Sequence, residues 1–149
     1  MPFGVNDWHS LTEEPTLEPD IPICDPHHHC WDRRPERIPY QNYLLPELYE
    51  DLNSGHNVVS TVFVEANAMY RPNGLEEMMP VGEVEFVQGL AAAADTGLYG
   101  PAKAAASIVG HANLHLGDAV EPVLEALQAA SPQRFRGIRH GLTYDDHPD

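Results

Sequence analysis

Val58-Val59-Ser60-Thr61-Val62-Phe63-Val64 is the stretch of sequence that decides the fold. Six of its seven residues are β-branched or aromatic, a composition that is typical of a strand. The stretch has no polar alternate face, so we expect both of its sides to be buried, as in a parallel sheet that is covered by helices.

Segments of helix and strand character alternate on both sides of this stretch. Strands are predicted at 21–25, 105–110 and 135–140, and helices at 46–53, at 83–95 and from an N-cap at Asp118 to about Ala130. With residues 58–64 included, the order is βαβαβαβ. This order predicts parallel pairing of the strands through right-handed crossovers.

Two architectures contain such units, the doubly wound open sheet and the (β/α)-barrel. A glycine-rich turn after the first strand favours the open sheet, but Pro26-His27-His28-His29 stands there instead. We therefore expect an α/β fold built from parallel (β/α) units of the TIM-barrel type. Because a full barrel needs about 250 residues, residues 21–149 correspond to about half of one, apparently truncated, after an irregular N-terminal arm at 1–20.

The composition excludes several classes of function. Asp and Glu outnumber Lys and Arg 23 to 8, and the resulting net charge of −15 disfavours a nucleic-acid partner. No apolar run is long enough to span a membrane, and the start of the chain lacks the pattern of a secretory signal. With only two cysteines there is no disulfide framework. We expect a cytoplasmic protein with reduced thiols.

The three consecutive histidines are the strongest candidates for chemistry. Side chains alternate along a strand, so His27 and His29 point the same way and His28 points the opposite way. Two imidazoles on one face can bind a divalent metal ion, with Asp25 orienting one of them. A solvated histidine-rich turn is the alternative interpretation of the same residues.

Three further candidates follow the ends of other predicted strands, where parallel α/β folds place their sites. Glu65 is a candidate for contact with substrate or metal, or else a solvated or capping acid. Arg139 suits a carboxylate or lactone oxygen, although pairing with one of the many acids is an alternative. His111 is a candidate for substrate binding, or else a hydrogen-bonded loop residue.

The segment Asp25-Pro26-His27-His28-His29-Cys30-Trp31-Asp32 resembles the first-strand signature Asp-x-His-x-His-x-Trp-Asp of the amidohydrolase-2 family, metal-dependent hydrolases with a TIM-barrel fold. Residues 17–24, 61–66, 108–114 and 135–140 resemble the family's lead-in and its next three strands. The resemblance implies that His27 and His29 contact the metal. It also implies further ligands, a histidine on each of two later strands and an aspartate on the last, which the 149 residues do not include.

The resulting expectation is a hydrolase in which a divalent metal ion activates water to attack a small-molecule carbonyl substrate, such as a lactone or an amide. Zinc is the first choice, and Mn, Fe and Ni also suit imidazole ligands. A related non-oxidative decarboxylase is one alternative. Another is an inactive barrel fragment that acts only by association, either with a second copy or with a separate C-terminal half. The substrate and the reaction type stay open.

Overall fold

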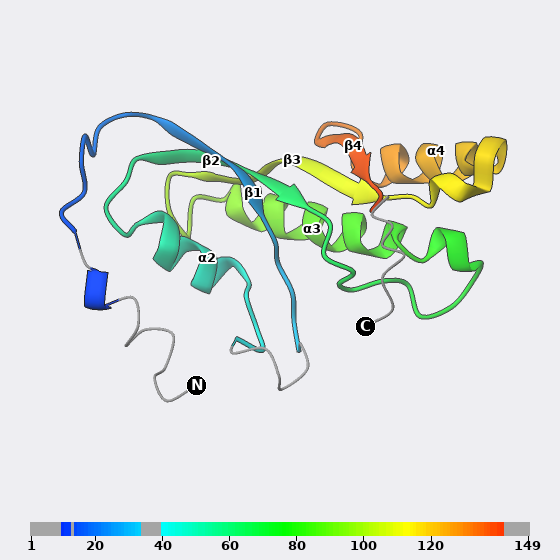
Figure 1. The fold of residues 1–149 in the computed structure, drawn as a ribbon, viewed down its shortest axis with the longest axis horizontal. Helices are drawn as coiled ribbons and strands as arrows, with labels where there is room; N and C mark the ends of the chain where they lie inside the picture. Colours follow the sequence, from blue (N-terminus) through cyan, green and yellow to red (C-terminus); the bar gives the residue numbers. More distant parts are fainter. Residues whose placement is uncertain (1–9, 13, 34–39, 142–149) are drawn as a thin grey trace, which may run out of the picture.

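A computed structural model describes residues 10–12, 14–33 and 40–141, and Figure 1 shows its fold. The sheet consists of β1 (Ile23–His28), β2 (Val58–Val64), β3 (Lys103–His111) and β4 (Phe135–Arg139). The α-helices are α2 (Leu45–Leu52), α3 (Val81–Ala94) and α4 (Glu121–Ala130), and the 3₁₀ helices are η1 (Ser10–Thr12), η2 (Glu76–Met78) and η3 (Leu114–Val120).

The four strands form one parallel sheet in the order β1-β2-β3-β4. Strands alternate with helices along the chain, and α2, α3 and α4 lie along one side of the sheet (Figure 1). The predicted α/β class with parallel strands is confirmed. None of the helices in the described ranges is long and apolar enough to cross a bilayer.

A single apolar core joins the helices to the sheet. Phe63 of β2, Ile108 of β3, Val84 of α3 and Leu127 of α4 are completely buried in it. Gly110 lies where this packing is closest, because a Cβ atom there would approach a methyl group of Val84 to 3.0 Å. Helices α3 and α4 therefore pack directly against β3. Close packing of this kind holds the carboxyl ends of the strands in fixed relative positions.

The first strand differs from its prediction, since it covers Ile23–His28 instead of 21–25. Pairing of His28 with Phe63 extends the strand past Pro26, and a bulge between Asp25 and His28 absorbs the irregularity. Two of the three histidines therefore belong to the strand itself.

The start of the last helix also differs from its prediction. Asp118 is not its N-cap, because η3 continues through Val120, and Val120 is the N-cap of α4. A proline at the first or second position of α4 favours this later start. In the predicted N-terminal arm, residues 14–22 form neither helix nor strand. Residues 1–9 and 13 of that arm, and 142–149 of the predicted half barrel, lie outside the described residues.

Candidate functional site

The end of β1 places two imidazoles side by side. His29 donates a hydrogen bond from Nδ1 to the carbonyl oxygen of Val64, the last residue of β2, at 2.7 Å. A carbonyl only accepts, so Nδ1 carries the proton and the lone pair of the neutral ring is at Nε2. The rings of His27 and His29 lie 4.9 Å apart at an interplanar angle of 82°. This second-strand carbonyl orients His29 as metal-binding histidines are commonly oriented.

Asp25 was predicted to orient a metal-binding imidazole. In the structure its carboxylate accepts a hydrogen bond from the backbone N–H of His27, at 3.1 Å. Asp25 therefore stabilises the bulge that carries His27, and the contact orients the backbone instead of the ring.

His28 points into the opposite layer, as the alternation along the strand predicts. It is buried and shares a 2.8 Å hydrogen bond with the hydroxyl of Thr61, which also accepts from the Ala105 N–H at 2.8 Å. The thiol of Cys30 lies 3.9 Å from its other ring nitrogen. Burial lowers the pKa of His28 to about 4, and it raises the pKa of Cys30 to about 12. A solvated turn therefore does not describe His28.

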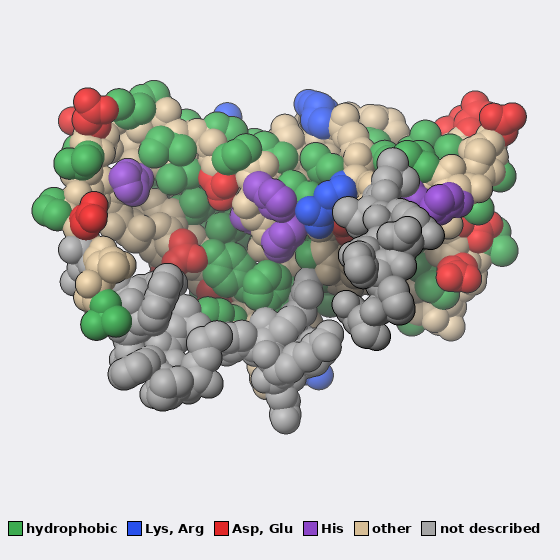
Figure 2. Space-filling model, viewed as in Figure 1, with side chains coloured by type: hydrophobic (Ala, Val, Ile, Leu, Met, Phe, Trp, Pro, Cys, Tyr) green, Lys and Arg blue, Asp and Glu red, His purple; other side chains and the backbone are tan. Residues whose placement is uncertain are grey.

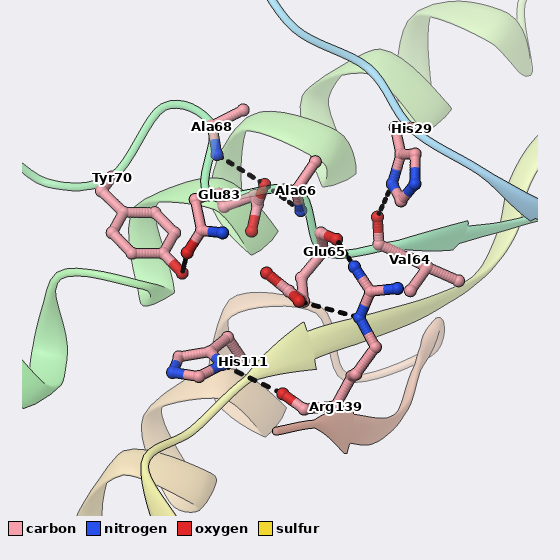
Figure 3. Close-up of polar contacts among 10 residues, drawn as sticks. His29, Val64, Glu65, Ala66, Ala68, Tyr70, Glu83, His111 and Arg139 are labelled. Atoms are coloured by element: carbon pink, nitrogen blue, oxygen red, sulfur yellow. Dashed lines mark hydrogen bonds and ion pairs between the residues drawn. The ribbon is translucent and has the colours of Figure 1, made fainter. Parts of the chain in front are cut away.

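Glu65 and Arg139 form an ion pair that crosses the sheet. The Nε atom of Arg139 donates to Glu65 Oε1 at 2.8 Å, and its Nη2 donates to the Glu65 carbonyl oxygen at 2.6 Å (Figure 3). Because β3 lies between β2 and β4, this pair links two strands that are not neighbours. The Oε2 atom of Glu65 is buried and has no hydrogen-bond partner in the described part of the chain.

His111 joins the same group through the backbone of Arg139. Its Nδ1 donates to the Arg139 carbonyl oxygen at 3.0 Å, which places the lone pair of its neutral ring at Nε2. His29, Glu65, Arg139 and His111 thus gather where the four strands end (Figure 3). On the face shown in Figure 2, histidine side chains meet a basic side chain near the middle of the molecule.

A pocket of about 490 Å³ adjoins His111 and is lined mainly by residues of the loop after β2 and of η3. It is lined in part by His115 and His140, which no sequence pattern had marked as site residues. The ring of His140 lies 5.4 Å from that of His111 and 5.1 Å from that of His115. Leu114 donates its N–H to Nδ1 of His140 at 3.1 Å, which fixes the ring. The pocket extends the candidate site over the ends of β3 and β4.

Glu83 is a residue whose role the sequence did not reveal. It lies completely buried in α3, and its Oε1 accepts from the N–H groups of Ala66 and Ala68, at 2.9 and 2.8 Å (Figure 3). It thereby fixes the loop that follows Glu65. One feature of the sequence does point to this role. Glu83 lies four residues before Val87, on the apolar face of the helix, and a carboxylate there is costly unless it is hydrogen-bonded.

The described ranges contain no group of three or more His, Cys, Asp and Glu side chains arranged to hold a metal ion. The pair formed by His27 and His29 nevertheless fits a metal, because the carbonyl of Val64 holds the His29 ring with its lone pair at Nε2. No protein-family model matches the chain, and neither does any curated protein or solved structure. A functional assignment therefore depends on the geometry of these side chains.

Proposed function

We propose that the chain is the N-terminal half of a metal-dependent hydrolase of the amidohydrolase type, with His27 and His29 as its first two metal ligands. The orientation of His29 by the Val64 carbonyl, with the His27 ring beside it, carries the proposal. In zinc sites a backbone carbonyl or a carboxylate commonly accepts from the ring nitrogen that does not bind the ion.

The order of the strands supports a barrel-type unit over a doubly wound sheet. In a doubly wound sheet the strand order reverses at a switch point, as in 3-2-1-4-5-6 or 2-1-3-4-5. Here the order β1-β2-β3-β4 has no reversal, and the helices lie along one side (Figure 1). Consecutive strands with helices on the outer side are the arrangement of a (β/α)-barrel, whose active site lies at the carboxyl ends of the strands.

The chain's own residues provide two parts of such a site. His27 and His29 would hold a divalent ion, zinc being our first choice, and a bound ion polarises a carbonyl group and lowers the pKa of water. Glu65 and Arg139 would hold the substrate. The contacts with Glu65 occupy Nε and Nη2 of Arg139, so the five N–H donors of the guanidinium are not all used.

Zinc titration of the metal-free chain by calorimetry tests the proposal. Two imidazoles are fewer ligands than the three or four of ordinary zinc sites, so we expect weak binding that a chelator reverses. His27→Ala should abolish the binding. His28→Ala, in the opposite layer, should leave it nearly intact although it costs packing, and His56→Ala is the matched control for an exposed histidine elsewhere.

Equal losses of zinc binding from all three substitutions would indicate non-specific binding to imidazoles and would contradict the assignment of the pair. Tight binding retained without His27 would refute the site at the end of β1. Lowering the pH should weaken the binding, because imidazole must be neutral to bind a metal.

A further inference from the structure

The pocket of about 490 Å³ beside His111 contains two imidazoles whose ring nitrogens have opposite roles. His111 donates from Nδ1 to the Arg139 carbonyl oxygen, so Nε2 of its neutral ring is an acceptor (Figure 3). His140 accepts the Leu114 N–H at Nδ1, at 3.1 Å, so Nε2 of its neutral ring carries the proton and is a donor. The backbone therefore fixes one acceptor and one donor at the wall of the same pocket.

The hydrogen bond to His140 disfavours a metal ion between the two rings. A metal ion binds imidazole through a nitrogen lone pair, and the neutral His140 ring has its lone pair at Nδ1, which the Leu114 N–H occupies. The rings of His111 and His140 lie 5.4 Å apart at an interplanar angle of 86°. The pair therefore suits a small organic group that carries a donor and an acceptor next to each other.

Other polar groups of the pocket favour the same kind of ligand. Tyr70 donates its hydroxyl proton to Asn67 at 3.0 Å, which leaves the Tyr70 oxygen as an acceptor and the Asn67 NH₂ group as a donor. Glu76 and Glu77 add two carboxylates, which disfavour an anionic ligand. A lactone has acceptors but no donor, so it would not satisfy the Nε2 of His111. The complementary ligand is neutral and has both a donor and an acceptor.

We propose that this pocket binds a neutral carboxamide or lactam group, whose N–H donates to Nε2 of His111 and whose carbonyl oxygen accepts from Nε2 of His140. In these groups the N–H and the C=O lie side by side on one edge. Met79, Pro80 and Leu116 provide apolar surface for the rest of the ligand. The assignment of this group to the substrate rests on the function proposed above, whereas its binding to the pocket requires no metal ion.

The two histidines have separate effects on specificity. A lactam and a lactone of the same shape both have a carbonyl oxygen for His140, but only the lactam has an N–H for His111. A site that is built to hydrogen-bond an N–H rejects the analogue that lacks it, because the acceptor is then left unpaired. His111 should therefore determine the preference for a lactam, and His140 should contribute to the affinity for both.

Titration of the full chain, kept free of metal with a chelator, tests the pocket with three matched probes. Oxindole is a lactam, benzofuranone is the lactone of the same shape, and N-methyloxindole lacks the N–H. NMR spectra of the histidine rings report where each probe binds. We expect oxindole to shift the signals of His111 and His140, and not those of the exposed His56. Oxindole should bind at least about tenfold more tightly than either of the other two probes.

Three ring-retaining substitutions assign the preference to its residues. His111→Phe removes the acceptor, so it should lower the affinity for oxindole to that for benzofuranone. His140→Phe should weaken the binding of both probes and retain the preference. His56→Phe, outside the pocket, is the matched control and should change neither.

Equal affinities of the wild-type chain for oxindole and benzofuranone overturn the inference, whether or not the variants fold. A preference for oxindole that persists in His111→Phe, with the wild-type circular dichroism retained, also overturns it.

Zinc titration of His27→Ala separates failure of this inference from failure of the proposed function, because the probes are tested without metal. If oxindole is preferred through His111 but zinc binding does not need His27, the amide site stands and the proposed metal pair is wrong. If zinc binding needs His27 but the lactam and the lactone bind equally, the metal pair stands and the amide site is overturned.

Discussion

His28 shows how one position in a histidine cluster serves packing instead of binding. Its ring is 7% exposed and is held between Thr61 and Cys30, in the layer opposite to His27 and His29. Because burial disfavours the charged imidazolium, its pKa falls from 6.5 to about 4. The cluster therefore divides into two exposed or half-buried rings that face the candidate site and one neutral ring that supports the strand.

The shifted pKa of His28 predicts a specific loss of stability in acid. Its pKa is lower in the folded chain than in the unfolded chain, so the unfolded chain takes up the proton first as the pH falls. Above about pH 6.5, titration of His28 therefore does not change the free energy of unfolding. As the pH falls from 6.5 to about 4, the free energy of unfolding should decrease by about 3 kcal/mol because of this group. Denaturant unfolding in the presence of a chelator measures it.

His28→Gln removes the titrating group and retains a polar side chain. Its free energy of unfolding should therefore fall less steeply than that of the wild type between pH 6.5 and 4. His56→Gln, at an exposed histidine, should follow the wild-type curve. Parallel curves for the wild type and His28→Gln would show that His28 is not neutral in the folded chain.

The loop after β2 depends on a helix that comes later in the chain. The carboxylate of Glu83 in α3 accepts hydrogen bonds from the N–H groups of Ala66 and Ala68. These two residues begin the loop that directly follows Glu65. Tyr70 donates to Asn67 in the same loop at 3.0 Å, and burial, together with Glu83 and Glu65, raises the pKa of its hydroxyl. A helix carboxylate thus holds the backbone that positions the candidate substrate-binding acid.

Replacing Glu83 should therefore be costly. Glu83→Ala leaves two amides of the loop without their acceptor, and we expect a loss of about 2–4 kcal/mol in the free energy of unfolding. Glu83→Gln retains an accepting oxygen and should lose much less. Glu85→Ala is the control on the same helix, because its ion pair with Arg71 is exposed and contributes about 1 kcal/mol or less. Equal losses for Glu83→Ala and Glu85→Ala would contradict the role of Glu83.

Local sequence patterns were sufficient to predict the elements and part of the site. The strand character of Val58–Val64 and the alternation of helices predicted the parallel sheet, because burial on both faces leaves a signal in every residue. Alternation along β1 also separated His28 from its two neighbours. The pairing of Glu65 with Arg139 and the contacts of Glu83 join residues far apart in the sequence, and no local pattern records such distances. The helix start predicted at Asp118 was wrong because η3 continues beyond this residue to Val120.

On the scale of the whole molecule, the ion pair between Glu65 and Arg139 gives the sheet a common carboxyl end. It connects β2 to β4 across β3, while His29 connects β1 to β2 and His111 contacts the backbone of β4. Each of these contacts uses a backbone carbonyl or a buried carboxylate. The four strand ends are thereby held as one surface, which is what a binding site shared by several strands requires.

The charge of the whole chain predicts how its stability depends on salt. A net charge of −15 on 149 residues repels itself in the compact state, and screening relieves that repulsion. The exposed ion pair between Arg71 and Glu85, and that between Arg134 and Asp95, lose strength as salt increases, but pairs of this kind contribute little.

Raising the ionic strength from 0.01 to 0.15 M shortens the screening length from about 30 to about 8 Å. We therefore expect the melting temperature to rise by a few degrees, equivalent to about 1 kcal/mol. Calorimetry at a fixed protein concentration measures the change, with an uncharged solute of equal osmolarity as control. A melting temperature that falls with salt would mean that local ion pairs outweigh the repulsion of the whole chain.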